Sequence, residues 1–226
     1  MLLQGAGQAL CVWQQRTEAI YFLDVGQGDG ILIRSPDGRN IVIDGGSTSQ
    51  SKCGTYTLLP ALRSQGMTEI DCWFVTHTDE DHISGLKELL LQGKLTQIKV
   101  RTVVFSAYVF QDAALAELEA VIRAAGITIV WMREGDVIGD DTFTLTCLHP
   151  TAEYRAKDKN AASLALAYHS DTFDMLFTGD MDADAVADMD IQQDYDCIKL
   201  PHHGSKYSYV EGVYACLLYT SPSPRD

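Results

Sequence analysis

The sequence predicts an α/β fold in which a sandwich of sheets is covered by helices on the outside. Closely spaced strand patterns open the chain, and strands then alternate with helical patterns further along. A second observation is a dense run of acidic and histidine side chains, residues 77–82, where a strand pattern gives way to a helical one. Such folds bind ligands at the carboxyl ends of their strands.

Composition sets limits on both the fold and the partners. The chain has 226 residues, of which 46% are hydrophobic, enough for one globular domain with a sizeable core. A formal net charge of −14 argues against tight, sequence-independent binding to duplex nucleic acid. This charge still permits a nuclease whose metal ions meet the phosphates. No apolar run is long enough for a membrane-spanning helix.

Strand and turn signals define the first part of the domain. A tight glycine turn at Gly26–Gly30 separates the first two strands, and Ser35–Gly38 has the composition of a hairpin turn. The glycine turn joins two strands rather than a strand and a helix, so it is not a dinucleotide-binding fingerprint. The predicted strands are Ile20–Val25, Ile31–Arg34, Asn40–Asp44, Cys72–Val75, Ile98–Phe105, Ile127–Trp131, Phe143–Leu148, Ser163–Tyr168, Phe173–Phe177 and Cys197–Pro201.

Four segments have helical signals. Three of them are Thr57–Ser64, Ala113–Ala125 and Asp182–Met189. The other opens at Asp81 and His82 and continues through Ile83–Leu90. Gly66 and Gly126 mark the ends of the helices Thr57–Ser64 and Ala113–Ala125, respectively. The segment Gly135–Asp141 is expected to be a turn, and His169 is expected in the turn between the two strands around it.

The segment His77–His82 is the strongest candidate for a metal site. His77 and Asp79 are two residues apart, so on an extended strand tip their side chains point the same way. Asp81 and His82 open the following helix, where free backbone N–H groups favour anions. The alternative, a solvated acidic loop, does not account for so many metal ligands in six residues. The spacing predicts two divalent ions, one for each pair.

The two ends of the chain are expected to lie outside the domain. Residues 1–17 show no pattern and are expected to be a connector or a frayed end. Residues 216–226 resemble the translation of a transposase-based sequencing adapter, so we treat them as an artefactual tail. The domain is therefore expected to cover residues 18–215 and to be incomplete at its C-terminus.

Taken together, the motifs resemble the metallo-β-lactamase fold, an αββα sandwich. They are Asp44–Gly46, His77–His82, Thr178–Asp180 and His202–Ser205. With Phe22–Asp29 added, the chain is similar to the C-terminal hydrolase domain of ComEC-type DNA-internalisation competence proteins and their stand-alone relatives. The resemblance covers about residues 20 to 210. It implies a metal-dependent hydrolase.

The resemblance implies a first metal site formed by His77 and Asp79, with Asn160. Asp79 stands where the superfamily has a second histidine, and Asn160 stands where it has a later one. Asp180 is expected to bridge the two ions. Because oxygen ligands are harder than imidazole, this first site should favour manganese over zinc. The cofactors are therefore two divalent ions, Mn²⁺ or Zn²⁺.

The second metal site is expected to contain Asp81, His82 and one of His202 and His203. His203 is favoured as the ligand and His202 as a phosphate contact, and the sequence leaves that choice open. A hydroxide between the ions would be the nucleophile, because metal ions lower the pKa of bound water. Asp81 is the candidate catalytic residue, since it would also orient that hydroxide.

Three further residues are expected to support the site. Asp44 should orient metal ligands without binding an ion itself. Ser205 and Lys206 follow the last motif and are candidates for binding a substrate phosphate, with the lysine acting as a point charge. For Lys206, an ordinary surface lysine is an equally good interpretation of the composition.

The resemblance implies a phosphodiesterase, a nuclease acting on DNA during competence-linked uptake. The alternative is a stand-alone hydrolase of a small phosphodiester or another ester, which the acidic charge favours. A non-catalytic docking domain is a third class, but metal ligands are intact at every motif. A competence role would add a membrane channel domain encoded upstream and place this domain on the extracellular face of the bacterial membrane.

Overall fold

Two sheets form the centre of the structure, a computed structural model that describes residues 17–189, 191 and 194–210. The first sheet has six strands in sequence order and mixes antiparallel with parallel pairs. Its strands are β1 (Ala19–Phe22), β2 (Gly30–Arg34), β3 (Asn40–Asp44), β4 (Glu69–Phe74), β5 (Lys99–Ser106) and β6 (Thr128–Met132).

The second sheet has five strands in the spatial order β11-β10-β9-β8-β7. Its strands are β7 (Val137–Gly139), β8 (Phe143–His149), β9 (Ala165–Ser170), β10 (Asp174–Phe177) and β11 (Cys197–Lys199). Only the pair of β10 and β11 is parallel among these described strands.

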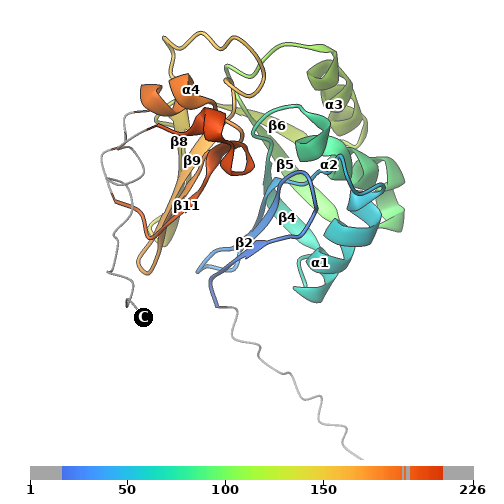
Figure 1. The fold of residues 1–226 in the computed structure, drawn as a ribbon. Helices are drawn as coiled ribbons and strands as arrows, with labels where there is room; N and C mark the ends of the chain where they lie inside the picture. Colours follow the sequence, from blue (N-terminus) through green and yellow to red (C-terminus); the bar gives the residue numbers. More distant parts are fainter. Residues whose placement is uncertain (1–16, 190, 192–193, 211–226) are drawn as a thin grey trace, which may run out of the picture.

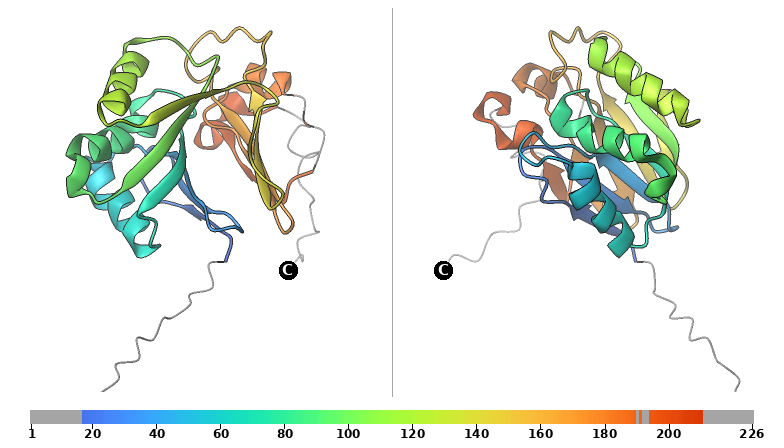
Figure 2. Two further views of the ribbon diagram at one scale, coloured as in Figure 1. Left: turned by 180° about the vertical axis from the view of Figure 1, so that it is seen from behind. Right: turned by 90° about the vertical axis from the view of Figure 1, so that its right-hand side faces the viewer.

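Helices cover the outer faces of both sheets (Figures 1 and 2), so the layers follow the order helix, sheet, sheet, helix. The helices and helical turns are η1 (Gly54–Leu58), α1 (Leu59–Ser64), α2 (Glu80–Gln92), η2 (Gly93–Leu95), α3 (Ala113–Ala124), α4 (Ala183–Asp188), η3 (Pro201–Gly204) and η4 (Lys206–Ser208). In Figure 1, α1, α2 and α3 lie beside the first sheet and α4 lies beside the second. This confirms the predicted αββα sandwich.

Buried hydrophobic clusters hold these layers together. The first lies between the six-stranded sheet and α1 to α3, and includes Leu62, Trp73 and Leu118. The second lies between the two sheets and includes Phe74 and Phe177. A smaller cluster joins the second sheet to α4. Because β2 and β3 are covered on both faces, they are continuous apolar runs instead of alternating ones.

Parallel pairing brings the predicted motifs to the carboxyl ends of neighbouring strands in each sheet. Strands β3 and β4 are parallel, with Ile43 opposite Phe74, so the segments that follow them leave the same edge. Strands β10 and β11 are parallel, with Phe177 opposite Lys199. The residues just after these four strands carry the metal-capable motifs. The fold therefore gathers motifs from distant parts of the chain at the carboxyl ends of these strands.

Most predicted elements are present, and the differences have physical causes. The segment Gly135–Asp141 was expected to be only a turn, but Val137–Gly139 pairs with β8 as a short edge strand. Three residues are too few to show a strand period in the sequence. His169 lies within β9, opposite Asp174, and not in the turn, although its side chain is exposed as expected. The first strand ends at Phe22 instead of Val25.

The predictions for the two chain ends lie almost entirely outside the described residues. This applies to the expected frayed segment 1–17, apart from residue 17, and to the expected tail 216–226. Within the described part, none of the helices has the length and apolar character needed to cross a membrane.

Candidate metal centre

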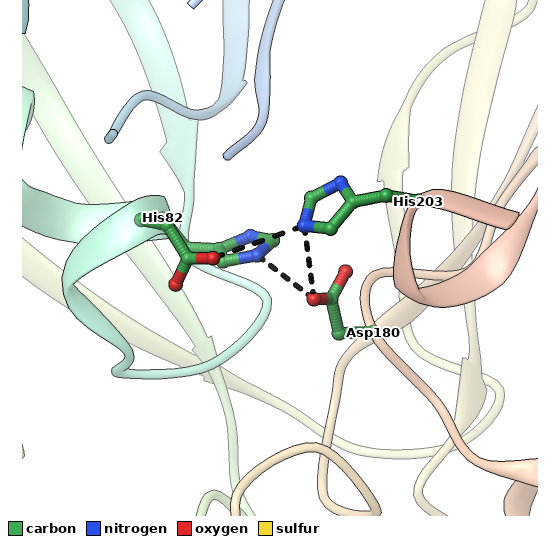
Figure 3. Close-up of side chains that lie close together, drawn as sticks. His82, Asp180 and His203 are labelled. Carbon is green, nitrogen blue, oxygen red and sulfur yellow. Dashed lines mark ion pairs between the residues drawn. The ribbon is translucent and has the colours of Figure 1, made fainter. Parts of the chain in front are cut away.

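Four side chains from three separate segments converge between the two sheets. They are Asp81, His82, Asp180 and His203, and one donor atom from each lies within 4.8 Å of all the others. His82 Nε2 and His203 Nε2 each lie 3.3 Å from Asp180 Oδ2, and His203 Nε2 lies 3.8 Å from Asp81 Oδ2. Figure 3 shows the side chains of His82, Asp180 and His203 pointing toward one another. All four are residues that the sequence predicted for the metal centre.

Asp44 holds His82 in a fixed orientation. Its Oδ2 lies 2.9 Å from His82 Nδ1, and its two oxygens accept hydrogen bonds of 2.8 Å from the backbone N–H and the hydroxyl of Thr76. Asp44 is buried at the end of β3. With Nδ1 of His82 engaged in this way, Nε2 is left to face the cluster. A carboxylate behind a histidine is a common arrangement around metal ligands.

His77 and Asp79 lie beside this group. His77 Nε2 is 3.6 Å from Asp79 Oδ2, and His77 Nδ1 is 3.1 Å from the Thr76 hydroxyl. The centroids of the His77 and His82 rings are 4.1 Å apart, so the two predicted metal sites adjoin each other. The Nε2 atoms of both histidines are buried and face carboxylates, Asp79 and Asp180, but neither makes a hydrogen bond of good geometry among the described residues. Buried polar atoms normally have partners, so these two fit a ligand role.

Burial and neighbouring charges shift the pKa values of the histidines in and beside this cluster. Burial lowers the pKa of His82, but the carboxylates of Asp44 and Asp180 outweigh it and raise the pKa to about 10. Hydrogen bonding to carboxylates, Asp180 first, raises the pKa of His203 to about 11. Burial and the charge of His82 lower the pKa of His77. Protons and metal ions therefore compete for His82 and His203.

Imidazole nitrogens and carboxylate oxygens are the donor types that Zn²⁺ and Mn²⁺ use in proteins. Carboxylate oxygens and imidazole nitrogens converge on one space, and the buried Nε2 atom of His82 faces it. The residues present therefore fit divalent metal ions.

The structure adds three charged residues that the sequence analysis did not select. The ammonium of Lys199 lies against Asp29 and 3.3 Å from Asp180 Oδ1, and it donates to the carbonyl of Gly179 at 2.8 Å. Asp29 Oδ1 also lies 3.4 Å from His203 Nδ1. Lys159 contacts Asp79. The place of Asp29 in the glycine turn was a sequence signal for its part in the site. The two lysines had no such signal, because their contacts with the site form only in the folded chain.

The predicted substrate residues lie on the turn that follows β11. His202 and His203 both have positive φ angles, 49° and 53°, which non-glycine residues seldom adopt away from functional sites. The centroids of their rings are 6.1 Å apart, and only His203 belongs to the converging group. Ser205 Oγ accepts from the backbone N–H of Tyr207, and the ammonium of Lys206 lies over that residue's ring.

Asn160 and its neighbour Lys159 lie on the segment that precedes β9. The backbone carbonyl of Asn160 accepts a 3.0 Å hydrogen bond from Ser163 N–H. It is Lys159 whose side chain reaches Asp79. His149 is buried at the end of β8, and its Nε2 lies 3.0 Å from the carbonyl oxygen of Ala161.

An αββα sandwich with buried histidines and carboxylates at the strand ends defines a metal-dependent hydrolase. The chain belongs to the metallo-beta-lactamase superfamily, whose family model matches residues 23–152, more than half of the chain. It is 31% identical over 202 residues to ComE operon protein 3 of Bacillus subtilis (strain 168). Both expected resemblances, to the superfamily and to ComEC-type proteins, are confirmed. The match covers 82% of this chain and 25% of the length of that relative.

A solved structure shows the same fold. The metallo-beta-lactamase fold protein YhfI from Bacillus subtilis matches with a TM-score of 0.51 at 14% identity, over 80% of this chain and 70% of that one. Zn²⁺-bound PqqB from Methylobacterium extorquens has a TM-score of 0.43 at 12% identity, over 70% of this chain and 56% of that one.

Proposed function

We propose that the chain is a two-metal phosphodiesterase, a nuclease that acts on DNA in competence-linked uptake. The observation that carries the proposal is the pair of adjoining donor sets around His77 and His82, whose buried Nε2 atoms make no hydrogen bond within the part of the chain that the structure describes. The second support is the relative, ComE operon protein 3, whose name refers to the ComE operon. The substrate and the number of ions belong to this proposal.

The residues of the chain have distinct tasks in this proposal. Bound divalent ions would supply Lewis acidity and lower the pKa of water at the site. His77 and Asp79 hold the first ion, while Asp81, His82 and His203 hold the second. Asp81 also aligns the attacking oxygen.

Five other residues have supporting tasks. Asp180 joins the two sites, and Asp44 keeps His82 Nε2 directed inward. His202, Ser205 and Lys206 lie on one turn beside His203 and are proposed to contact the substrate phosphate.

Manganese is the proposed metal. Asp79 replaces an imidazole with a hard carboxylate oxygen at the first site, and Asn160 is proposed to complete that site. Hard ligands favour Mn²⁺ over Zn²⁺ relative to an all-histidine site. Hydrolysis of bis-p-nitrophenyl phosphate should therefore be faster with Mn²⁺ than with Zn²⁺ at matched occupancy, and equal or faster zinc rates would reject the metal assignment.

The central test combines metal content with activity. The purified protein should bind about two divalent ions and cleave both bis-p-nitrophenyl phosphate and a DNA oligonucleotide. The double variant His77→Ala, Asp180→Ala should lose metal and both activities while keeping its fold by circular dichroism. A double variant as metal-loaded as the parent by elemental analysis would show that the site is assigned wrongly.

The alternative is a hydrolase of a small phosphodiester or another ester. The formal net charge of −14 favours it, because DNA binding normally relies on lysine and arginine contacts to phosphates. Cleavage of bis-p-nitrophenyl phosphate with no cleavage of single- or double-stranded DNA would select this alternative.

The setting is also a proposal. Since the chain spans 25% of the length of ComE operon protein 3, a membrane channel domain encoded upstream is the expected partner. The hydrolase domain would then lie on the extracellular face of the bacterial membrane. Sequencing the gene upstream of residue 1 tests this directly: a non-membrane neighbour would contradict it.

A further inference from the structure

We infer that Lys159 is an intramolecular competitor for the metal site of His77 and Asp79, and that its ammonium weakens the binding of an ion there. The inference rests on the proposed two-metal function and adds a residue that sets the affinity of one site.

The ammonium of Lys159 lies between two carboxylates. Its Nζ is 2.9 Å from Asp79 Oδ1 and 2.9 Å from Asp112 Oδ2. The side chain of Lys159 is 28% exposed and that of Asp112 is 19% exposed, so these are not fully solvated surface pairs. Asp112 is itself fixed, because its Oδ1 accepts from Leu115 N–H at the start of α3. The ammonium is therefore held in a defined place.

The carboxylate of Asp79 can contact Lys159 because it does not cap the start of α2. It is the residue that precedes the first turn of α2, where an aspartate normally accepts a hydrogen bond from the helix backbone. Here its side chain makes no such bond. One oxygen faces Lys159 and the other faces His77 Nε2 at 3.6 Å. The carboxylate therefore serves the site instead of the helix.

A metal ion and the ammonium would share the same carboxylate. An ion held by His77 Nε2 and Asp79 would lie close to the positive charge of Lys159, which repels it. The ammonium also neutralises part of the negative charge that attracts a divalent ion. Lys159 must therefore move away, or the first site must bind weakly. Lys159 does not weaken ion binding at the second site in this way, because its carboxylate partners are Asp79 and Asp112.

The test is calorimetric titration of the metal-free protein with Mn²⁺. The parent should show two affinity classes separated by about tenfold or more. Lys159→Met keeps the length of the side chain and removes its charge, so it should tighten the weaker class by about tenfold and leave the tighter class unchanged. Electron paramagnetic resonance gives an independent readout, because paired Mn²⁺ ions should appear at lower Mn²⁺ concentration in this variant.

Two control variants separate charge from shape. Lys159→Arg retains the charge and should behave like the parent. Lys157→Met removes a nearby lysine that pairs with Asp182 and Asp184 instead, and it should not change either class. If Lys159→Met has a thermal midpoint near that of the parent and the affinity of its weaker Mn²⁺ class is unchanged, the inference is wrong. The proposed function would not be affected by that result. Absence of any tight Mn²⁺ class in every variant would overturn both the inference and the proposed function.

Discussion

The chemistry of single residues at this site depends on what lies behind each ligand. His82 faces the cluster with Nε2 because Asp44 engages its Nδ1, and Asp44 is in turn fixed by two hydrogen bonds from Thr76. This chain of contacts starts at the end of β3 and finishes at the metal cluster. A ligand held in this way loses little conformational entropy when an ion binds.

Asp44→Asn tests this support. Asp44 has a φ of 56°, a region that asparagine tolerates well, so the backbone should stay in place. An asparagine amide has one accepting oxygen, so it cannot take all three hydrogen bonds that the two carboxylate oxygens accept from Thr76 and His82. We therefore expect metal affinity to fall by about 10- to 100-fold. Asp71→Asn, a matched change on β4 away from the cluster, should leave affinity unchanged in the same titration. Equal affinities in all three proteins would contradict the role of Asp44.

His149 gives a prediction about pH. Burial lowers the pKa of this histidine below its usual value. Its Nδ1 is buried 3.8 Å from Asp188 Oδ2 and makes no hydrogen bond among the described residues. The unfolded chain therefore takes up the proton first as pH falls. Stability from this residue is present above about pH 6.5 and is lost as pH falls from there toward the lowered pKa. In urea unfolding, His149→Gln should lose less free energy of unfolding between about pH 7.5 and pH 5 than the parent. Equal losses would contradict the argument.

At the level of elements, the start of α2 is positioned by a very close backbone approach. A Cβ atom added at Gly46 would lie 2.6 Å from backbone atoms of Glu80, Asp81 and His82. Nearby, Asp29 N–H donates to the carbonyl of Asp81 at 3.1 Å. The glycine after β3 therefore lets the metal-binding end of the helix pack directly onto the neighbouring loop.

Gly46→Ala should push α2 away from this loop. We expect a loss of about 1–3 kcal/mol of stability, as for overpacked sites, together with weaker metal binding. Gly126→Ala is the control: Gly126 has a φ of 72° and no atom within 4 Å of the added Cβ, so it introduces backbone strain only. That variant should lose about 1–2 kcal/mol and keep its metal affinity. Normal metal affinity in Gly46→Ala would show that the close approach does not position the ligands.

The sequence was informative about elements because strand and helix signals are local. Apolar runs marked β3 and β5 closely, and Gly126 marked the end of α3. The metal motifs were visible because each one follows a strand. Lys159 and Lys199 were not, since their partners come from segments far away in the sequence. Contacts of that kind depend on how the two sheets face each other, which no local pattern records.

At the level of the whole molecule, the net charge and the chemistry of the metal centre have opposite effects on the binding of a phosphate substrate. The formal net charge is −14, yet the proposed substrate is a polyanion. Divalent ions at the site would attract phosphates at short range, while the net charge repels them at long range. Long-range terms are screened by salt, with a Debye length of about 10 Å at 0.1 M, whereas contacts at the metal centre are screened much less.

This opposition predicts an unusual salt dependence. Proteins that bind DNA through lysine and arginine lose affinity steeply as salt rises. For this chain, kcat/KM on a DNA oligonucleotide should stay level or rise between about 0.02 and 0.2 M KCl, because salt screens the repulsion of the approaching strand. Bis-p-nitrophenyl phosphate carries a single negative charge and should be almost insensitive over the same range. Metal content measured at each salt concentration controls for lost ions. A steep fall in the DNA rate at constant metal content would mean that a local basic surface governs binding instead of the net charge.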